Sequence, residues 1–245
     1  MNYNWNWSVF FREVPSGGAT YVDWLLSGLG WTLAVAISAW LIAFVLGSVL
    51  GVLRTLPSRF LSGIATTYVE VFRNIPLLVQ LFIWFYVVPE LLPREIGDAI
   101  KQMDPTTSQF MTAFIALGLF TAARVCEQVR AGIESLARGQ KNAGLALGLT
   151  LGQTYRHVLL PMAFRVIIPP LTSEFLNIFK NSAVALTIGL LELTAQSRQI
   201  SEYTAQTFEA FIAATVLYLI VTMIVMLAMR HLEKRVRVPG YIGAN

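Results

Sequence analysis

Long apolar runs separated by short charged segments dominate this chain. The thirty residues from Trp24 to Leu53 contain no Asp, Glu, Lys or Arg, and Ala210 to Met229 is a second uncharged run. About 20 apolar residues are enough for a helix to cross a bilayer. Three further apolar runs carry charges inside them or at their edges. The pattern predicts five transmembrane helices, at about 25–53, 60–89, 108–131, 163–191 and 208–230.

The composition strengthens this prediction. Hydrophobic residues make up 56% of the 245 residues, charged residues make up 13%, and the mean hydropathy is +0.61. Soluble domains are less apolar and carry about 25% charged residues. We therefore expect an all-α membrane protein with a single transmembrane domain over residues 1–245, and not a soluble helical bundle with a large core.

Basic and acidic residues occupy alternate loops between the predicted spans. The acidic loops hold Glu90, Glu95, Asp98 and Asp104, and then Glu192, Glu202 and Glu209. The basic segments hold Arg54, Arg59, Arg130, Arg138, Lys141, Arg156, Arg165, Arg230, Lys234, Arg235 and Arg237. Basic loops face the cytoplasm, which predicts an external N-terminus and a cytoplasmic C-terminus. The net charge of +4 thus reports topology, and we expect no nucleic-acid partner.

Catalytic and metal-binding patterns are absent from the sequence. Cys126 is the only cysteine, and His157 and His231 have no ligand cluster around them. The sequence contains no GxxxxGK[ST] phosphate loop, so we expect ATP hydrolysis to be absent from this chain. Neither an HExxH nor a GxSxG motif occurs, which argues against a membrane enzyme. We expect no catalytic residue, metal ion or cofactor.

Four ionisable residues lie deep inside predicted spans: Glu70 and Arg73 in the second, and Glu174 and Lys180 in the fourth. A charge at the bilayer centre costs at least about 2.5 kcal/mol, so such a residue is a functional candidate by default. Glu70 and Arg73 are three residues apart and share a helix face, where they can pair. Glu174 and Lys180 are six apart, so we expect them to use separate partners.

These charges and the polar residues beside them predict a solute pathway near the middle of the membrane. Pro76 cannot donate a backbone hydrogen bond, so the turn before it can open and present backbone groups. Cationic side chains would attract carboxylates, anionic ones would meet an ammonium group, and neutral ones would add hydrogen bonds. The candidate substrate-binding residues are Arg73, Asn74, Glu70, Glu174, Lys180, Asn181 and Ser182.

An amino acid dicarboxylate matches this set, because it has two anionic ends and one cationic centre. The alternative is that these charges form structural ion pairs, either between helices or across a subunit interface. That alternative applies most strongly to Glu70, whose neighbour Arg73 is already an adequate partner.

The loop from Arg138 to Pro161 combines small residues, leucines and basic residues. Small residues let two backbones approach closely, and leucines can fill a groove, which together predict a short helix pressed against another protein. We expect Pro161 to end this helix. The alternative is an amphipathic helix lying on the lipid surface. The candidate docking residues are Asn142, Ala143, Gly144, Leu147, Gly148 and Pro161.

The same loop resembles the EAA loop of ABC-transporter permeases, in which the EAA triplet, a glycine and a final proline recur at fixed spacing. Here Asn142 and Gly144 replace the leading Glu and the second Ala, while the spacing to Gly148 and Pro161 is kept. Three further segments, EVFRNIPLLVQL, TAARVCEQVRAGIESLARGQ and KNSAVALTIGLLEL, are similar to the polar amino acid importer permeases of histidine and glutamate type. Glutamate/aspartate import permeases are the most similar.

The resemblance implies a type I ABC importer permease of the bacterial inner (cytoplasmic) membrane, which translocates substrate by alternating access. A second permease subunit, in a heterodimer, and a cytoplasmic ATP-binding dimer would be its partners. ATP and magnesium would bind that dimer. A periplasmic binding protein would deliver the amino acid, and membrane lipid would surround the spans. An ion-coupled secondary carrier or channel for a small anionic solute is the alternative function.

Overall fold

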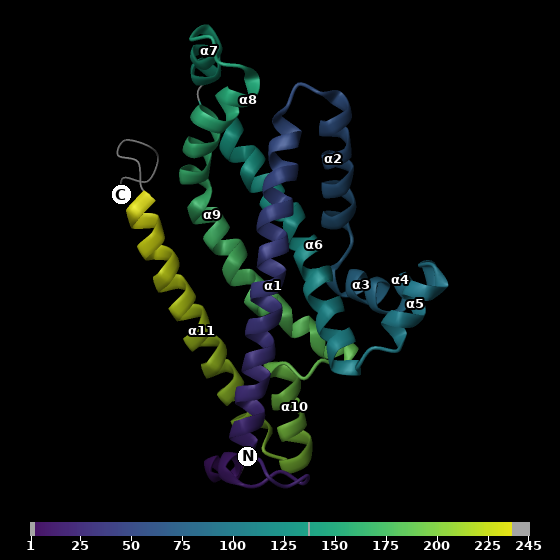
Figure 1. Cartoon of the computed structure of the whole chain (residues 1–245). Helices are drawn as coiled ribbons and strands as arrows, with labels where there is room; N and C mark the ends of the chain where they lie inside the picture. The colour runs from purple at the N-terminus through teal and green to yellow at the C-terminus, as the bar shows by residue number, and fades with distance from the viewer. Residues whose placement is uncertain (1–2, 137, 237–245) are drawn as a thin grey trace. The chain divides into compact units, whose positions relative to one another are not determined.

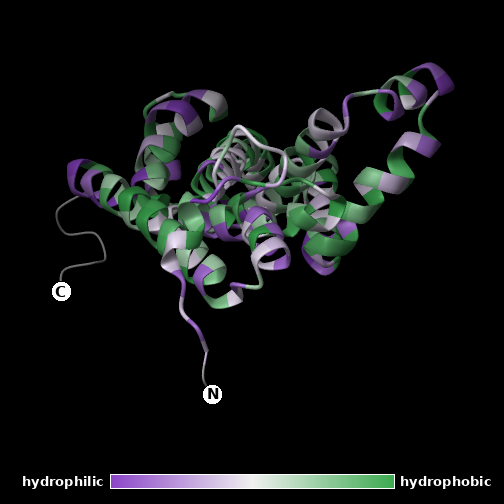
Figure 2. Cartoon of the chain, turned by 90° about the horizontal axis from the view of Figure 1, so that it is seen from below, coloured by the Kyte–Doolittle hydropathy of each residue, from purple (hydrophilic) through white to green (hydrophobic). Residues whose placement is uncertain are grey.

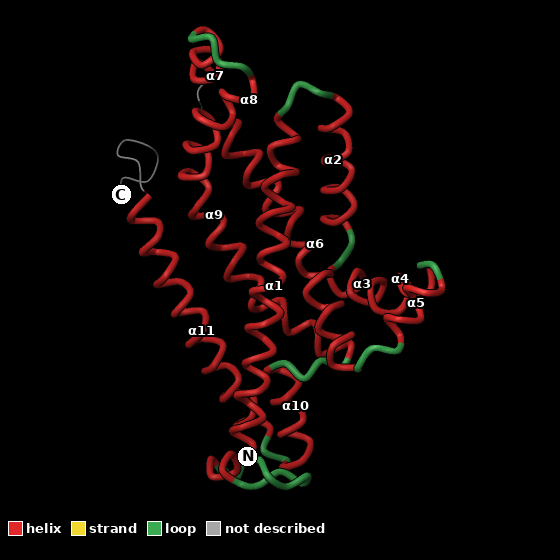
Figure 3. The backbone as a smooth tube through the Cα atoms, in the orientation of Figure 1, coloured by secondary structure: helices red, strands yellow, loops and turns green. Residues whose placement is uncertain are grey.

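The computed structural model describes residues 3–136 and 138–236. Residues 1–2, 137 and 237–245, which include Arg237, lie outside the described part. Within the described ranges the chain is helical, with short connecting loops and one isolated bridge between Glu13 and Thr20 (Figure 1, Figure 3). This confirms the predicted all-α class.

The helices differ widely in length. The longer ones are α1 (Tyr21–Thr55), α2 (Arg59–Asn74), α6 (Pro105–Glu134), α9 (Leu160–Asn181), α10 (Leu193–Thr204) and α11 (Thr207–Val236). The shorter ones are α3 (Leu77–Phe82), α4 (Val88–Leu91), α5 (Arg94–Lys101), α7 (Arg138–Ala146) and α8 (Leu151–Thr154). Single π-helical turns at Ile83–Val87 and Tyr155–Leu159 join α3 to α4 and α8 to α9.

Four helical segments are long and apolar enough to cross a membrane: Tyr21–Thr55, Pro105–Glu134, Leu151–Ile188 and Thr207–Val236. A fifth span results if the broken pair Arg59–Asn74 and Leu77–Leu91 counts as one. Hydrophobic residues, coloured green, are frequent along the helices in Figure 2. Leu219, Ile224 and Leu227 of α11 are each more than half exposed, as expected for side chains that face lipid.

The predicted second span is broken, and proline is the physical reason. The proline ring disfavours the helical region for the residue that precedes it. Ile75 accordingly adopts an extended conformation, with φ −98° and ψ 128°, and Pro76 follows with φ −56° and ψ 140°. The apolar run at 60–89 therefore forms separate helices, and the opening expected at Pro76 is present as an interruption of the helix.

The chain packs as two compact units. Unit 1 consists of Met1–Ala39, Pro76–Leu117 and Asn177–Ile224, and unit 2 of Trp40–Ile75, Gly118–Leu176 and Val225–Asn245. Helices α1, α6, α9 and α11 contribute residues to both units. A single transmembrane domain over residues 1–245 stays a prediction.

Unit 2 is built around a close contact between α1 and α6. Gly47 and Gly51 have GxxxG spacing, which permits two helices to approach closely in membranes. A β-carbon on Gly51 would lie 2.6 Å from Cβ of Val129, and one on Gly47 would lie 2.6 Å from the carbonyl oxygen of Ala122. Neither glycine can therefore be replaced without a shift of α6. Around this contact, Ala43, Val125 and Ile133 belong to the main apolar core of the unit.

Unit 1 ties the N-terminal segment and α10 to α11 and α1. The backbone N–H of Asn6 donates to Oε1 of Glu209 at 2.6 Å, and the Tyr3 hydroxyl donates to Oε2 of the same carboxylate. Glu192 is fully buried and caps α10 by accepting from the N–H groups of Thr194 and Ala195, at 3.0 and 2.9 Å.

The carboxylate of Glu192 also accepts from two hydroxyls of neighbouring helices. The Tyr218 hydroxyl of α11 donates to Oε2 at 2.9 Å, and the Thr32 hydroxyl of α1 lies 3.4 Å away. Burial raises the pKa of the Glu192 carboxyl, and these hydrogen bonds act in the opposite direction. One side chain thus connects three helices of unit 1.

Candidate translocation and docking sites

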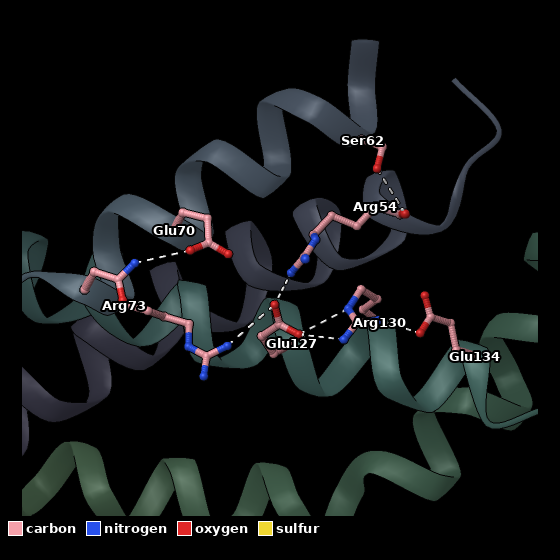
Figure 4. A network of polar contacts seen from close by, with 8 residues as sticks. Arg54, Ser62, Glu70, Arg73, Glu127, Arg130 and Glu134 are labelled. Atoms are coloured by element: carbon pink, nitrogen blue, oxygen red, sulfur yellow. Dashed lines mark hydrogen bonds and ion pairs between the residues drawn. The ribbon is translucent and has the colours of Figure 1, made fainter. Parts of the chain in front are cut away.

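A network of charged side chains in unit 2 converges on Glu127 of α6 (Figure 4). Arg54 of α1 donates from Nη1 to Oε1 of Glu127. Arg130 of α6 donates from Nη2 to Oε2 at 3.0 Å, and Arg73 of α2 lies with Nη1 3.7 Å from Oε1. Three guanidinium groups from three helices therefore share one carboxylate.

Only one of these three arginines has a second ion-pair partner among the described residues. Arg130 also reaches Glu134, one helical turn further along α6, at 2.5 Å. Arg73 makes the longest of the contacts, and its side chain is 53% exposed, whereas that of Arg54 is 13% exposed. Of the three arginines, Arg73 is therefore the one that the network holds most weakly.

A second ion pair in unit 2 joins α6 to α9. Nε of Arg124 donates to Oε2 of Glu174 at 2.8 Å. Glu174 is buried, with 7% of the residue exposed, while the side chain of Arg124 is 42% exposed. A buried carboxylate requires a partner of opposite charge, and Arg124 supplies it.

Both groups of charges line one cavity of about 270 Å³ in unit 2. Its walls are Arg73, Phe120, Arg124, Glu127, Gln128 and Glu174. The lining thus offers two guanidinium groups, two carboxylates, one amide and one aromatic ring. This combination can bind a small zwitterion or dicarboxylate, because guanidinium groups hydrogen-bond carboxylates in bidentate fashion.

The partners of the charged residues in the structure differ from those that the sequence predicts. Glu70 accepts a hydrogen bond from Nδ2 of Asn74 at 3.2 Å, while Arg73 pairs with Glu127 (Figure 4). The possible Glu70–Arg73 pair is therefore not the ion pair formed, because Glu127 on α6 competes for the guanidinium. Glu174 does have a separate partner, as expected, but that partner comes from the third predicted span and not the second.

The remaining predicted substrate residues belong to unit 1. Lys180 is exposed and Ser182 is buried. The Ser182 hydroxyl donates to the carbonyl of Phe179 at 2.7 Å, which already satisfies its hydrogen. Asn181 and Ser182 line a cavity of about 10 Å³ with apolar neighbours, which is room for no more than a water molecule. Within unit 1 these side chains form no space for a solute.

Sequence reasoning missed Arg124, Glu127 and Gln128 as members of the site. Their signal was present, because Arg124 and Glu127 are charges inside the predicted span 108–131. These residues lie close to the basic loop that follows the span, where charged residues are also explained by membrane topology. Charge inside a span was the criterion that found Arg73 and Glu174, and it applies equally to these residues.

The predicted docking segment folds as helix, turn and helix. Helix α7 ends in a Schellman motif: N–H of Gly148 bonds the carbonyl of Leu145 at 3.0 Å, and N–H of Leu149 bonds that of Gly144 at 3.1 Å. Gly148 has φ +83°, which favours glycine. Thr150 then caps the next helix in a capping box with Gln153.

Within this segment one small residue is packed against the neighbouring helix, while the residues beside it are exposed. Gly144 is buried against α8, where a β-carbon would lie 2.9 Å from Cγ2 of Thr154. Asn142 and Ala143 are exposed, and Leu147 is 82% exposed. Leu145 is 42% exposed as well, so the rest of the described chain leaves two leucines of this short segment uncovered.

The expected role of Pro161 as the end of this helix is wrong. The first helix ends at Ala146, before Gly148, and Pro161 lies at the start of α9. Pro161 directly follows the π-helical turn Tyr155–Leu159, inside the continuous helical segment Leu151–Ile188. Proline disturbs the regular hydrogen bonds of the turn before it, and a π-helical turn is a departure from that regular pattern. Pro169 and Pro170 also lie inside α9.

The chain is all-α and has four or five candidate spans, a charged cavity, and two short exposed helices joined by a turn. This architecture is typical of a membrane transport protein. Residues 43–238 match the family described as binding-protein-dependent transport system inner membrane component. The chain belongs to this family. It is accordingly a multi-pass inner-membrane permease component of such a transport system.

Individual relatives agree with this assignment. The chain is 54% identical over 246 aligned residues, and over the full length of both chains, to the glutamate/aspartate import permease protein GltJ of Escherichia coli strain K12. It is 31% identical to the glutamate/aspartate import permease protein GltK of E. coli O6:H1, over 95% of this chain and 99% of that protein.

A solved structure shares the fold. A crystal structure of an amino acid ABC transporter with histidines contains a chain that is 29% identical, with a TM-score of 0.74. The match covers 88% of this chain and 95% of that one. The expected resemblance to ABC importer permeases is therefore confirmed.

Proposed function

We propose that this chain is a permease subunit of an ABC importer for glutamate and aspartate. The observation that carries the proposal is the full-length similarity, at 54% identity, to a protein named as a glutamate/aspartate import permease. The charged cavity in unit 2 supports it, because its guanidinium groups suit substrates with two carboxylates.

Arg73 is the best supported of the predicted substrate residues. Its guanidinium lines the cavity, is half exposed and makes only a long contact to Glu127. A substrate carboxylate can therefore bind it without breaking a short ion pair. Glu174 lines the same cavity, and Glu70 with Asn74 lies beside Arg73 on α2. Lys180, Asn181 and Ser182 belong to unit 1, and their contact with the substrate stays a prediction from the sequence.

Energy for transport would come from a partner ATPase dimer that docks on α7 and the turn after it. Leu147 would fill a groove on the ATPase, with Asn142, Ala143 and Gly148 around it, while Gly144 holds α7 against α8. Pro161 would act indirectly, because it lies in the helical segment that runs on from α8 into α9. This arrangement requires the cytoplasmic orientation of the loop that the charge pattern predicts.

Two further partners complete the proposed assembly. The similarity to GltK, also named a glutamate/aspartate import permease, supports a heterodimer of two related permease subunits. A periplasmic binding protein would deliver the amino acid to the outer face. We propose that transport follows alternating access, in which rigid-body movement exposes the cavity to one side at a time.

Reconstitution tests the proposed function directly. Proteoliposomes that contain this chain, a second permease and the ATPase should accumulate labelled glutamate only when the binding protein is outside and ATP inside. Aspartate should compete for uptake, and lysine should not. Uptake driven by an ion gradient without the ATPase would contradict the proposal and favour a secondary carrier. ATP-dependent uptake of neutral amino acids alone would contradict the substrate assignment.

Co-purification tests the docking surface. Leu147→Asp should abolish recovery of the ATPase with the permease, because a charge would replace an exposed apolar anchor. Leu91→Asp is the matched control, since Leu91 is similarly exposed, at 78% against 82%, but lies in α4. Equal recovery of the ATPase by both variants would contradict docking at Leu147.

A further inference from the structure

The side chain of Arg124 is held in place by a single one of its nitrogen atoms. Nε donates to Glu174 at 2.8 Å. An arginine has five N–H donors, so four remain on the two terminal nitrogens. These nitrogens make no hydrogen bond to any residue in the described ranges. The guanidinium is therefore fixed in orientation, but its two terminal NH₂ groups stay free to bind a carboxylate. We call this pair of NH₂ groups the fork of Arg124.

The surroundings of Arg124 place that fork at a cavity and not against packed helices. The side chain is 42% exposed and lines the 270 Å³ cavity together with Arg73. Pockets for organic ligands measure about 300–1,000 Å³, so this cavity is of the size expected for a compact solute. Glu174 is 7% exposed and accepts from Nε, which leaves the two terminal nitrogens of the guanidinium group unengaged by this carboxylate.

We propose that Arg124 binds the side-chain carboxylate of the substrate and thereby distinguishes acidic amino acids from their amides. The inference rests on the proposed function and adds a residue to it. Arg73 is then available for the other carboxylate, because both arginines line the same cavity. Glu174 is a positioning residue, since it acts on the substrate only through Arg124.

The chemistry of the fork explains the discrimination. Two parallel N–H groups of Arg124 meet two acceptor oxygens of a carboxylate in a bidentate contact. A glutamine side chain offers one acceptor and one NH₂ group, so one N–H of the fork would face another donor. Buried polar groups that lose their partner reject an analogue much more strongly than a change of size does.

Direct binding to the membrane complex isolates this site from the periplasmic binding protein. We would measure equilibrium binding of labelled glutamate to the purified complex of this chain, the second permease and the ATPase, with the binding protein omitted. Arg124→Gln should weaken glutamate binding at least about tenfold, the loss expected for a charged hydrogen bond. Competition by glutamine should change by less than about threefold, because the amide gains little from the fork.

The alternative is that Arg124 has a structural role only, in which it neutralises the charge of Glu174 and does not contact the substrate. This alternative predicts a different result. In that case the double variant Arg124→Gln with Glu174→Gln should recover wild-type glutamate binding. If Arg124 contacts substrate, the double variant stays weak, whereas Arg124→Lys retains part of the affinity. Arg198→Gln is the control, since Arg198 is an exposed arginine that pairs with Glu202 at 2.8 Å on α10.

The outcomes separate this inference from the proposed function. Failure of the wild-type complex to import glutamate would contradict the proposed function. Wild-type import with unchanged glutamate binding in Arg124→Gln, or with recovery in the double variant, would overturn the role of Arg124 alone. A wild-type complex that imports glutamate but binds none of it at millimolar concentration would overturn it too.

Discussion

The hydroxyl of Tyr155 donates a hydrogen bond of 2.8 Å to the backbone carbonyl of Thr55, the last residue of α1. Tyr155 is buried, with 6% of the residue exposed, and it directly follows α8. The bond therefore anchors the segment that follows the docking turn to the end of a long apolar helix within unit 2.

We expect Tyr155→Phe to remove this hydrogen bond and lower the free energy of unfolding by about 1 kcal/mol. For a chain of this length, that change lowers the melting temperature by roughly 2–4 °C. Thermal scanning of the purified protein in detergent measures it. Tyr86→Phe is the control, because Tyr86 is 59% exposed and should leave the melting temperature unchanged.

The contact between α1 and α6 makes a second prediction. Gly51→Ala would place a methyl group 2.6 Å from Cβ of Val129, which α6 can accommodate only by shifting. Overpacking of this kind costs about 1–3 kcal/mol. The variant should melt at a lower temperature in the same assay. Gly30→Ala on the same helix meets nothing within 4 Å, and it should be as stable as the wild type.

The left-handed conformation of Gly148 predicts a local effect on docking. An alanine at φ +83° is strained by about 1–2 kcal/mol, so Gly148→Ala should distort the turn between α7 and α8. We expect reduced recovery of the ATPase in a co-purification assay. Gly152→Ala has open space around it and a conformation that alanine tolerates, and recovery should remain normal. Equal recovery of the ATPase by both variants would contradict the prediction that docking depends on the geometry of this turn.

The buried carboxyl of Glu192 predicts a pH dependence of stability. Burial raises its pKa above the ordinary 4.5 of a glutamic acid. The folded protein then holds this proton more tightly than the unfolded chain does. Its contribution to stability is present at low pH and is lost as pH rises from about 4.5 through the raised pKa.

Glu192→Gln should remove this dependence, because glutamine does not ionise. The difference in unfolding free energy between wild type and variant should change by at most about 1.4 kcal/mol per pH unit, the limit for one proton. Denaturation series at several pH values measure this difference. Glu202→Gln serves as the control, because the Glu202 side chain is 59% exposed.

Periodicity and composition predicted the fold well where local chemistry decides it. The uncharged run after Trp24 lies within one helix, α1. The break at Pro76 follows from the restriction that proline places on Ile75. The prediction that the docking helix ends at Pro161 is wrong because Gly148, well before Pro161, supplies the left-handed residue that a Schellman motif requires.

The candidate site was harder to predict, because partner choice depends on which helices are neighbours. Spacing alone suggested that Glu70 and Arg73 could pair, yet Arg73 pairs with Glu127 on a helix more than fifty residues away. Spacing could not reveal that Arg124 lies opposite Glu174. Long-range pairs of this kind are decided by packing between helices, which one sequence does not display.

The shared carboxylate of Glu127 has a consequence for how this protein can vary. Loss of any one arginine among Arg54, Arg73 and Arg130 leaves the carboxylate with two others. Loss of Glu127 removes the ion-pair partner that Arg54 and Arg73 have among the described residues, and leaves Arg130 with Glu134 alone. In a library of single substitutions scored for folded protein, position 127 should therefore be the intolerant one, and the three arginines should each accept change more readily. Sequence changes at this site would therefore have to begin with the replacement of an arginine and not of Glu127.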